Sequence, residues 1–353
     1  MKKISLFVAL LAASVSLFAW VSPISLPNVG DARLRIVSQN AENYHNNYNA
    51  TNKTAWTDEE FYEKTEKMAN VFLALNADII VICEAGRNSE SLLGYLANEL
   101  NELTGKNQFT YVTDLFDPEV AELGQYQSIK TGFVYNYKKV AAYGNSFSPY
   151  TSGDYEARMR IQLFMEEGTE EFFYLSANHF KAKSGGGDQG ESTRLKNVSN
   201  LLYTLDNPPT FLPEDPDILI VGDLNSYPGE QPILNLEAAG YAEQLTRFSP
   251  DAYTYIYGGE KGILDHIMAN ATMSKQITGA AAYNINNDNT VDPSYYYSDH
   301  DPVIVGLKLE KQQQSSVDNV STTSPTAVKV ILNGKIYIMH NGKTYNITGQ
   351  VVK

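Results

Sequence analysis

The sequence has a single cysteine, Cys83, among 353 residues, so no disulfide can form within the chain. It also lacks the Gly-x-Ser-x-Gly turn of serine hydrolases and the Walker phosphate loop of many nucleotide hydrolases. No Cys or His cluster of the kind that holds zinc is present, and no apolar run after residue 19 is long enough to cross a bilayer. These absences exclude a disulfide scaffold, two common hydrolase classes, a structural zinc domain and a transmembrane protein.

Basic residues are also few, since 27 Lys and Arg stand against 41 Asp and Glu, giving a net charge of −14. Such a chain gains little from neutralising phosphates, which argues against a tight nucleic-acid binder. An enzyme that turns over a phosphate ester is still compatible, because a bound divalent metal offsets the charge where the phosphate lies.

The first residues have the pattern of an export signal. Lys2 and Lys3 precede an uncharged apolar run over residues 4–19 that ends in small residues. A membrane anchor is the alternative, but a span needs roughly 20 or more apolar residues. We therefore expect a signal peptide at residues 1–19 and a protein that is secreted or at the cell surface, with the periplasm as the alternative.

The next part of the chain alternates strand and helix patterns. Apolar periodicity predicts helices at residues 57–75, 89–103 and 194–205, the first with a capping box between Thr57 and Glu60. β-rich runs predict strands at residues 34–39, 78–83, 109–113, 131–137, 160–165, 172–179, 217–221, 263–269 and 303–309. This alternation indicates an α/β catalytic domain at residues 20–310, with its sheet in the middle.

The composition changes after Glu310. A Gln- and Ser/Thr-rich stretch predicts a linker at residues 311–326. The tail at residues 327–353 carries two Asn-Gly pairs, Asn333-Gly334 and Asn341-Gly342, between β-forming runs, which predicts a hairpin tail of about three strands. Such a tail cannot form much of a core alone.

Polar residues recur where predicted strands end. Glu84 follows one apolar run, and Asp223 and Asn225 lie two apart just past another, beside Gly222. Asn178-His179 ends a further predicted strand, with Lys181 and Lys183 beyond it, and Ser298-Asp299-His300 precedes an apolar strand. Each has an ordinary structural alternative, such as an Asx turn or a solvated charge. Together they provide the groups that phosphate-ester hydrolysis needs.

The order of these motifs resembles the endonuclease/exonuclease/phosphatase superfamily over residues 34–309. The spellings Gln39-Asn40-Ala41-Glu42-Asn43 and His179-Phe180-Lys181-Ala182-Lys183 look most like its secreted bacterial nucleases. The resemblance implies a four-layer α/β sandwich, in which two packed mixed, mainly antiparallel sheets have helices outside and a cleft at one sheet edge.

The resemblance also implies a role for each matching residue. Glu84 would be the principal Mg²⁺ ligand, with Asn40 and Glu42 beside it and Asp299 on the far side of the metal. Carboxylate and amide oxygens suit Mg²⁺, Mn²⁺ or Ca²⁺ better than zinc. The remaining roles concern catalysis. Asp223 and His300 would prepare the attacking water, and Asn225 would hold a phosphate oxygen. His179 would be oriented by Asp265 and meet the phosphate as a cation, and Arg158 and Lys181 would contact the substrate phosphate. His266 is interpreted as structural.

The leading hypothesis is an exported, metal-dependent phosphodiesterase whose substrate, rather than stable partner, is nucleic acid, with DNA foremost. A sphingomyelinase-like or inositol-phosphate phosphodiesterase or phosphatase would use the same residues, and a non-catalytic binding module is the third hypothesis. We expect a monomer. The tail resembles C-terminal sorting tails of exported Bacteroidetes proteins, which would engage secretion machinery; a small accessory hairpin is the alternative.

Overall fold

The structure is a computed structural model that describes residues 21–45, 57–86, 90–113, 129–149, 158–184, 187–210, 212–213 and 215–311, and the strands of the tail. The chain divides into two compact units, residues 1–310 and 311–353. The predicted signal peptide, the linker beyond residue 311 and both Asn-Gly pairs lie outside the described residues.

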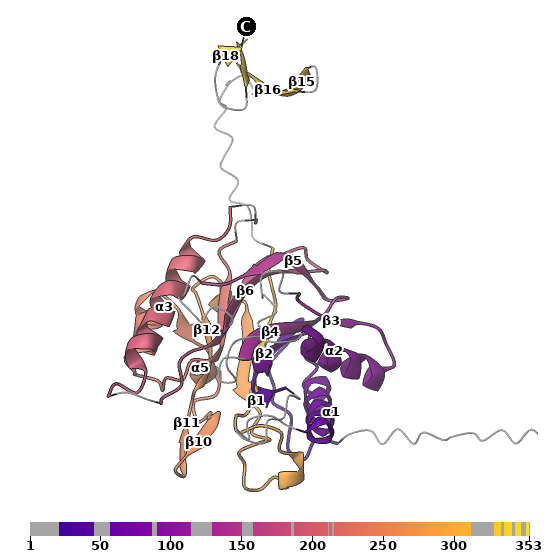
Figure 1. Cartoon of the computed structure of the whole chain (residues 1–353), viewed down its shortest axis with the longest axis vertical. Coiled ribbons are helices and arrows are strands. Elements are labelled where there is room, and N and C mark those ends of the chain that lie inside the picture. Colours follow the sequence, from indigo (N-terminus) through magenta and orange to yellow (C-terminus); the bar gives the residue numbers. More distant parts are fainter. Residues whose placement is uncertain are drawn as a thin grey trace, which may run out of the picture. The chain divides into compact units, whose positions relative to one another are not determined.

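The first unit contains two six-stranded sheets (Figure 1). The first sheet has the spatial order β13 (Ile277–Ala282), β14 (Val303–Leu307), β1 (Leu34–Tyr44), β2 (Ile79–Gly86), β4 (Ile129–Asn136) and β3 (Phe109–Tyr111). The second has the order β5 (Val140–Phe147), β6 (Met159–Glu166), β7 (Phe172–His179), β8 (Ile218–Asp223), β12 (Asp265–Ala269) and β9 (Ala242–Glu243). Only the neighbours β1–β2 and β7–β8 are parallel; the other strand pairs are antiparallel.

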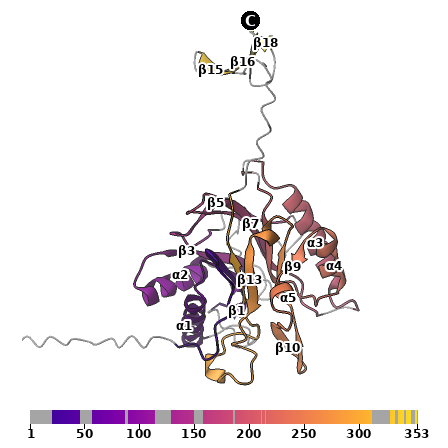
Figure 2. The ribbon, with the colours of Figure 1, turned by 180° about the vertical axis from the view of Figure 1, so that it is seen from behind.

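Three hydrophobic clusters separate four layers. The middle cluster lies between the sheets and takes Ile36 and Val81 from the first sheet and Leu219 from the second. The outer clusters join the first sheet to α1 (Asp58–Ala74) and α2 (Glu90–Thr104), and the second sheet to α3 (Glu191–Asp206) and α4 (Gln231–Ala238). Figures 1 and 2 show the two helix pairs on opposite sides of the sheets. The predicted four-layer sandwich is confirmed.

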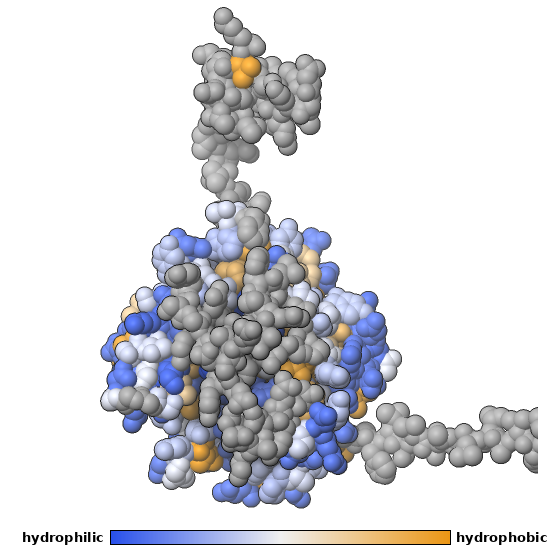
Figure 3. All heavy atoms as spheres, in the orientation of Figure 1, coloured by the Kyte–Doolittle hydropathy of each residue, from blue (hydrophilic) through white to orange (hydrophobic). Residues whose placement is uncertain are grey.

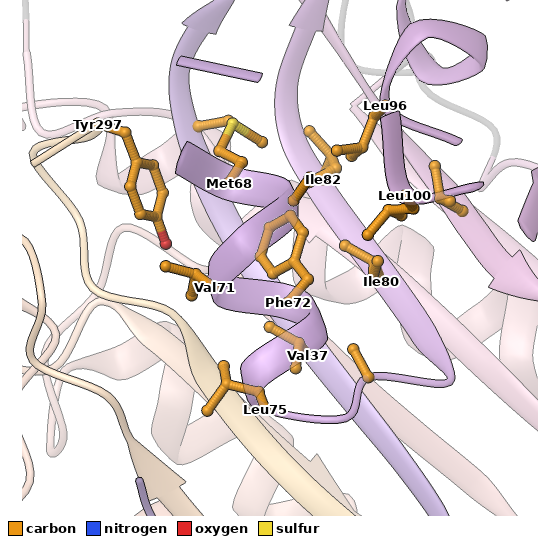
Figure 4. Close-up of a cluster of buried hydrophobic side chains, with 14 of the residues drawn as sticks. Val37, Met68, Val71, Phe72, Leu75, Ile80, Ile82, Leu96, Leu100 and Tyr297 are labelled. Carbon is orange, nitrogen blue, oxygen red and sulfur yellow. The ribbon is translucent and has the colours of Figure 1, made fainter. Parts of the chain in front are cut away.

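The packing of α1 shows how the sequence pattern produces one of these layers. The predicted capping box is present, since the Thr57 Oγ1 accepts from the backbone N–H of Glu60 and Glu60 accepts from that of Thr57. Met68 and Phe72 of α1 then pack against Ile82 and Ile80 of β2 (Figure 4). Val81 of β2 lies in the middle cluster, so this strand is buried on both faces, and its first five residues, Ile79–Cys83, are continuously apolar.

Several elements differ from the sequence-based expectation. Strands β5 and β13, helix α4 and the hairpin of β10 (Tyr255–Tyr257) and β11 (Glu260–Gly262) were not predicted. The sequence of β13, Ile-Thr-Gly-Ala-Ala-Ala, has no strong β-formers after its first two residues, so its pairing with β14 decides its conformation. A Cβ on Gly279 would come within 2.6 Å of the Val29 backbone, which explains a small residue there. The remaining short elements are α5 (Leu245–Phe248) and the 3₁₀ turns η2 (Met273–Lys275) and η3 (Pro293–Tyr295).

A charged clamp joins the two sheets at the start of β1. The Nε and Nη2 of Arg33 donate to the two carboxylate oxygens of Glu166, at 2.9 and 3.0 Å, and Nη2 also donates to the carbonyl of Leu309. Burial would raise the pKa of Glu166, but the bonds from Arg33 and Thr169 hold it below its usual range. The clamp therefore connects the end of β6 in one sheet to both β1 and the segment after β14 in the other.

The second unit is an antiparallel meander in which each strand pairs with the next. Its strands are β15 (Val328–Leu332), β16 (Lys335–His340), β17 (Lys343–Asn346) and β18 (Val351–Val352). The short fourth strand exceeds the expected three.

One face of the first unit is drawn with its hydropathy in Figure 3. On the face drawn in Figure 3, hydrophilic residues predominate among those described, and hydrophobic ones occupy small separate areas. None of the helices in the described part of the chain is long and apolar enough to span a membrane.

Candidate active site

Six strand ends meet at one edge of the sandwich. The parallel pairs β1–β2 and β7–β8 end there, and the antiparallel strands β14 and β12 begin there beside them. In the second sheet, His179 is aligned with Asp223, and Asp223 with Asp265, across β7, β8 and β12. Aligned residues of neighbouring strands share a face, and alternation from Val221 in the middle cluster places these three on the face toward the first sheet.

These ends surround a cleft of about 590 Å³. The described residues that line it are Asn40, Glu84, His179, Ala182, Lys183, Gln189, Asp223, Asn225, Tyr227, Glu230, Tyr255, Tyr257, Leu264, Asp299 and His300. Seven of the predicted site residues, from both sheets, thus line one cavity: Asn40, Glu84, His179, Asp223, Asn225, Asp299 and His300.

Glu84 reaches the cleft through an irregularity in β2. Strict alternation from Ile80 and Ile82 would place Glu84 on the helix-covered face. Instead Glu84 has a left-handed backbone, with φ of 63°, and the register with β4 shifts between Ile82 and Ala85. A bulge of this kind re-aims the side chain. Its carboxylate accepts from Asn40 Nδ2 at 3.1 Å and from the Asn43 backbone N–H at 2.9 Å.

The charge of Glu84 is stabilised by these neighbours. Burial would raise the pKa of Glu84, but the hydrogen bonds from Asn40 and Asn43 and the positive charge of His300 lower it below its usual range. Glu84 is therefore a fixed, ionised carboxylate in the cleft.

Asn40 connects the two halves of the site. Its Nδ2 donates to Glu84 and, at 3.0 Å, to Asp223 Oδ2, while its Oδ1 accepts from the Glu42 backbone N–H at 3.1 Å. The amide oxygen, the atom that would coordinate a metal, is thus engaged by the backbone. In this arrangement Asn40 positions two carboxylates, and its assignment as a metal ligand stays a prediction, because an amide oxygen has a second lone pair.

The residues predicted to hold a metal fit a divalent cation. Burial raises the pKa values of Glu42 and Asp299, and Glu84 raises both further, so these carboxylates repel one another. Lys64, a buried lysine, donates to the Glu42 carbonyl at 3.2 Å. Among the described residues, no three His, Cys, Asp or Glu side chains gather closely enough to hold a metal by themselves. Magnesium is typically held by one or two carboxylates, with water and substrate phosphate completing its coordination, so this donor set suits it.

The partner of Asp265 differs from the prediction. Its Oδ2 lies 2.7 Å from Nδ1 of His300, not of His179. In the sheet order β7–β8–β12, β8 separates His179 from Asp265 by two strand spacings, about 9.5 Å between their strands. The order of motifs along the chain does not reveal which strands are neighbours in the sheet. The expected His179–Asp265 pair is therefore wrong, since Asp265 pairs with His300.

The two histidines consequently have opposite electrostatic environments. Burial would lower the pKa of His300, but Asp265 and Asp223 raise it well above its ordinary value. Burial lowers the pKa of His179 to about 4, although its Nε2 lies 3.6 Å from Glu84 and from Asp223. His300 is therefore a cation and His179 neutral near pH 7, which reverses the charge expected for His179.

Asn225 holds Asp223 in place. The backbone N–H of Asn225 donates to Asp223 Oδ1 at 2.8 Å, and its Nδ2 donates to Asp223 Oδ2 and the Phe180 carbonyl, both at 3.1 Å. Burial and the nearby Asp265 raise the pKa of Asp223 above its usual range, against the lowering effect of His300. Asp223 thus has a carboxylate that can accept a proton near neutral pH.

The basic candidates separate into near and far groups. Lys183 lines the cleft, whereas Lys181 donates to Ser184 at 3.2 Å and is not among the lining residues. Arg158 accepts from the His179 backbone N–H at 2.8 Å through its carbonyl, so its backbone adjoins the site. His266 lies between Glu243 and the Ser226 carbonyl and is fully buried, in agreement with its structural interpretation.

Sequence reasoning missed two features of the site. Tyr255 lies on the unpredicted β10–β11 hairpin, and the centre of its ring is 4.6 Å from the centre of the His300 ring. The turn that carries Asp299 and His300 is held by Asn286, which donates to the His300 carbonyl at 2.7 Å, and by Asp301, which accepts from the Asn286 backbone. Asp301 adjoins a recognised motif, but Tyr255 and Asn286 have no spacing pattern that distinguishes them.

Comparisons with known proteins agree with this geometry. The model of the Endonuclease/Exonuclease/phosphatase family matches residues 58–300. No curated protein matches the chain. A mannosyl-6-phosphatase of Bacteroides thetaiotaomicron is one similar solved structure, with 14% sequence identity and a TM-score of 0.54; the match covers 78% of this chain and 100% of that one. The human Nocturnin catalytic domain is another, with 16% identity and a TM-score of 0.52; the match covers 78% of this chain and 94% of that one. A third is TDP2 of D. rerio, solved with a single-strand DNA product, with 14% identity and a TM-score of 0.51; the match covers 78% of this chain and 99% of that one.

Proposed function

Because the chain belongs to the endonuclease/exonuclease/phosphatase family, we propose that it is a secreted, divalent-metal-dependent phosphodiesterase that hydrolyses nucleic acid, DNA foremost. The observation that carries the proposal is the meeting of Asp223, the His300–Asp265 pair and the Glu84 carboxylate in one cleft. These groups come from four strand ends in two sheets, and they match the needs of phosphoryl chemistry.

Each residue has a task in the proposed reaction. A divalent cation held by Glu84, with Glu42 and Asp299 nearby, would supply charge neutralisation at the phosphate. Asp223 accepts a proton from the attacking water, and Asn40 and Asn225 orient its carboxylate. His300, kept cationic by Asp265, stabilises the negative charge that develops on the phosphoryl oxygens. Neutral His179 offers a ring N–H to a phosphate oxygen. The family resemblance implies that Asn225 also holds a phosphate oxygen.

The choice of nucleic acid over a small phosphate ester is supported by two points. The spelling around Asn40 and His179 resembles secreted bacterial nucleases, and the similar TDP2 structure has a single-strand DNA product bound. The similar mannosyl-6-phosphatase favours a second candidate, a phosphatase for small phosphomonoesters that uses the same site.

The termini extend the proposal to location. We propose that residues 1–19 direct export and that the meander of β15–β18 directs the protein to secretion machinery, with residues 311–326 as the linker. An apolar segment after two lysines supports the first assignment, and the tail's resemblance to sorting tails supports the second.

Parallel assays test the activity. The purified protein is incubated with Mg²⁺ against DNA, RNA, sphingomyelin, inositol phosphates and a sugar phosphate, with and without EDTA. We expect EDTA-sensitive cleavage of DNA, and a loss of at least about a hundredfold in kcat for both Asp223→Ala and His300→Ala. The double variant is expected to have a kcat little lower than that of either single variant, because Asp223 and His300 act together on the attack of one water molecule. Activity retained in EDTA, or turnover of the sugar phosphate alone, would contradict the proposal.

A further inference from the structure

Carboxylates predominate among the charged residues of the cleft wall. Among the described residues that line it, Glu84, Asp223, Glu230 and Asp299 are carboxylates, and Lys183 is the one lysine or arginine. A polyanionic substrate has phosphates on either side of the scissile one, and an acidic wall repels them. His300, also a cation, is assigned to the scissile phosphate, which leaves Lys183 as the lining cation that could receive a neighbouring one.

The Lys183 side chain is held in a defined position. Its Nζ lies 2.5 Å from each carboxylate oxygen of Glu230 and 4.9 Å from the centre of the Tyr227 ring. Glu230 is itself fixed, because it accepts from the Tyr227 backbone N–H at 3.0 Å. An ammonium group has three N–H donors, and the two bonds to Glu230 leave one for an anion in the cleft.

The segment that carries Lys183 is anchored beneath. Arg194 of α3 is 3% exposed, and its Nη1 donates to the carbonyls of Lys181 at 3.1 Å and Gln189 at 2.9 Å. These two carbonyls flank Lys183 along the chain, and Gln189 also lines the cleft. The hydrogen bond to the carbonyl of Lys181, two residues before Lys183, therefore ties this part of the cleft rim to α3.

Folding stability does not explain the ion pair between Lys183 and Glu230. The Lys183 and Glu230 side chains are 24% and 36% exposed, and ion pairs at such exposure contribute little to folding stability. The pair instead fixes where the ammonium lies.

We propose that Lys183 binds a second, non-scissile phosphate of the substrate, so that the enzyme prefers phosphodiesters that carry at least one further phosphate. The inference rests on the proposed function and deepens it, since it selects oligonucleotides over diesters with a single phosphate. Phosphate contacts position a nucleic acid without reading its sequence, so Lys183 adds affinity for the chain and no base preference.

Steady-state kinetics on two substrates test this role. Bis(p-nitrophenyl) phosphate has one phosphate, and a short single-stranded DNA oligonucleotide has several. Lys183→Met is expected to raise KM for the oligonucleotide by about tenfold, the scale of one charge-assisted hydrogen bond, with kcat unchanged. Its KM for bis(p-nitrophenyl) phosphate should equal that of the wild type, and Lys183→Arg should retain most of the oligonucleotide preference. The slope of log KM for the oligonucleotide against log salt should fall by about one.

Lys308→Met is the matched control, because Lys308 forms a comparable ion pair with Asp31, at 2.7 Å, and does not line the cleft. It removes the same charge and should leave both KM values unchanged. Equal changes on both substrates, no change, or a selective effect of Lys181→Met instead would overturn the role of Lys183. A wild-type protein that cleaves bis(p-nitrophenyl) phosphate but shows no salt-dependent preference for the oligonucleotide overturns this inference alone. Failure to cleave either diester would overturn the proposed function with it.

Discussion

At the scale of single residues, the site separates two histidines by charge. His300 has a carboxylate partner and a raised pKa, whereas His179 is buried with its pKa lowered to about 4. Groups whose environments drive their pKa values apart commonly take different roles in one reaction. Here the cation and the neutral ring face Asp223 from two sides, at 3.9 and 3.6 Å.

The pairing of Asp265 with His300 makes a prediction about coupling. Asp265→Asn is expected to lower kcat by about 10- to 100-fold, as loss of an orienting carboxylate does. Since Asp265 acts through His300, adding the change to His300→Ala should cost nothing further. Added to His179→Ala, it should retain most of its effect.

A double-mutant cycle on kcat measures both couplings, and melting temperatures exclude loss of folded protein. If Asp265→Asn is instead additive with His300→Ala and silent with His179→Ala, then Asp265 serves His179 in solution.

The identities of the site residues were predictable from sequence, but their geometry was not. Asp223 and Asn225 follow one apolar strand and His300 precedes another, with turn residues beside them, so local pattern indicates them. The direction of Glu84 depends on a bulge, and the partner of Asp265 depends on strand order. Both are tertiary properties that periodicity does not contain.

At the scale of elements, the parallel pair β7–β8 depends on a glycine. Gly222 has φ of 125°, and a Cβ there would lie 2.0 Å from the Asn178 carbonyl oxygen. The two residues are aligned partners directly before His179 and Asp223. This close backbone approach sets the separation of two predicted catalytic groups.

Gly222→Ala should therefore destabilise the fold by at least about 3 kcal/mol, through strain and backbone displacement. Activity of the protein that still folds should also fall. Gly229→Ala is the control, because Gly229 has φ of 85° but open space around its Cβ position. Its cost should be about 1 kcal/mol, with activity retained. Denaturant unfolding and kcat per folded molecule check both variants, and equal costs would show that the contact with Asn178 is unimportant.

Elements were predictable where apolar periodicity was strong, as in α1 and β2. They were missed where partners decide the conformation. Three of the eight residues of β5 are exposed, β13 is Gly and Ala after its first two residues, and the β10–β11 hairpin has polar and aromatic residues facing solvent and cleft. A single-sequence pattern has little to detect in such segments.

At the scale of the whole molecule, the Arg33–Glu166 clamp gives the sandwich a pH dependence. The pKa of Glu166 is lowered in the folded state from an ordinary value of 4.5. A depressed carboxyl pKa contributes stability above the unfolded value and loses it as the pH falls through the folded value. Glu166→Gln should therefore lower stability by about 1 to 2 kcal/mol at pH 7, and the difference should shrink below pH 4.5 and be lost once the pH falls through the lower pKa of the folded state.

Thermal melts of both proteins between pH 3 and 8 measure this difference. Glu167→Gln, the adjacent exposed residue, is the control for loss of a negative charge. A stability difference that persists unchanged in acid would assign the effect to packing instead of charge.

The boundary at residue 310 makes a separate prediction. A chain that ends at Glu310 retains Leu309, the acceptor for Arg33, and Glu310, whose backbone N–H donates to Gln276 at 2.8 Å. It should keep the melting temperature and specific activity of the longer protein. In the native host the same truncation is expected to block release to the surface or medium. Normal release would contradict the sorting role, whereas a lowered melting temperature would show that the second unit stabilises the first.

The position of β14 has a consequence for how the protein is made. This late strand lies between β13 and β1, and the bond from Gln39 to the His300 carbonyl joins residues 261 apart in the chain. Until the ribosome has delivered β14, β1 remains an unpaired edge and Asp299 and His300 are missing from the site. A chain terminated early by a nonsense codon is therefore catalytically silent, and its open strand edge exposes it to aggregation and proteolysis.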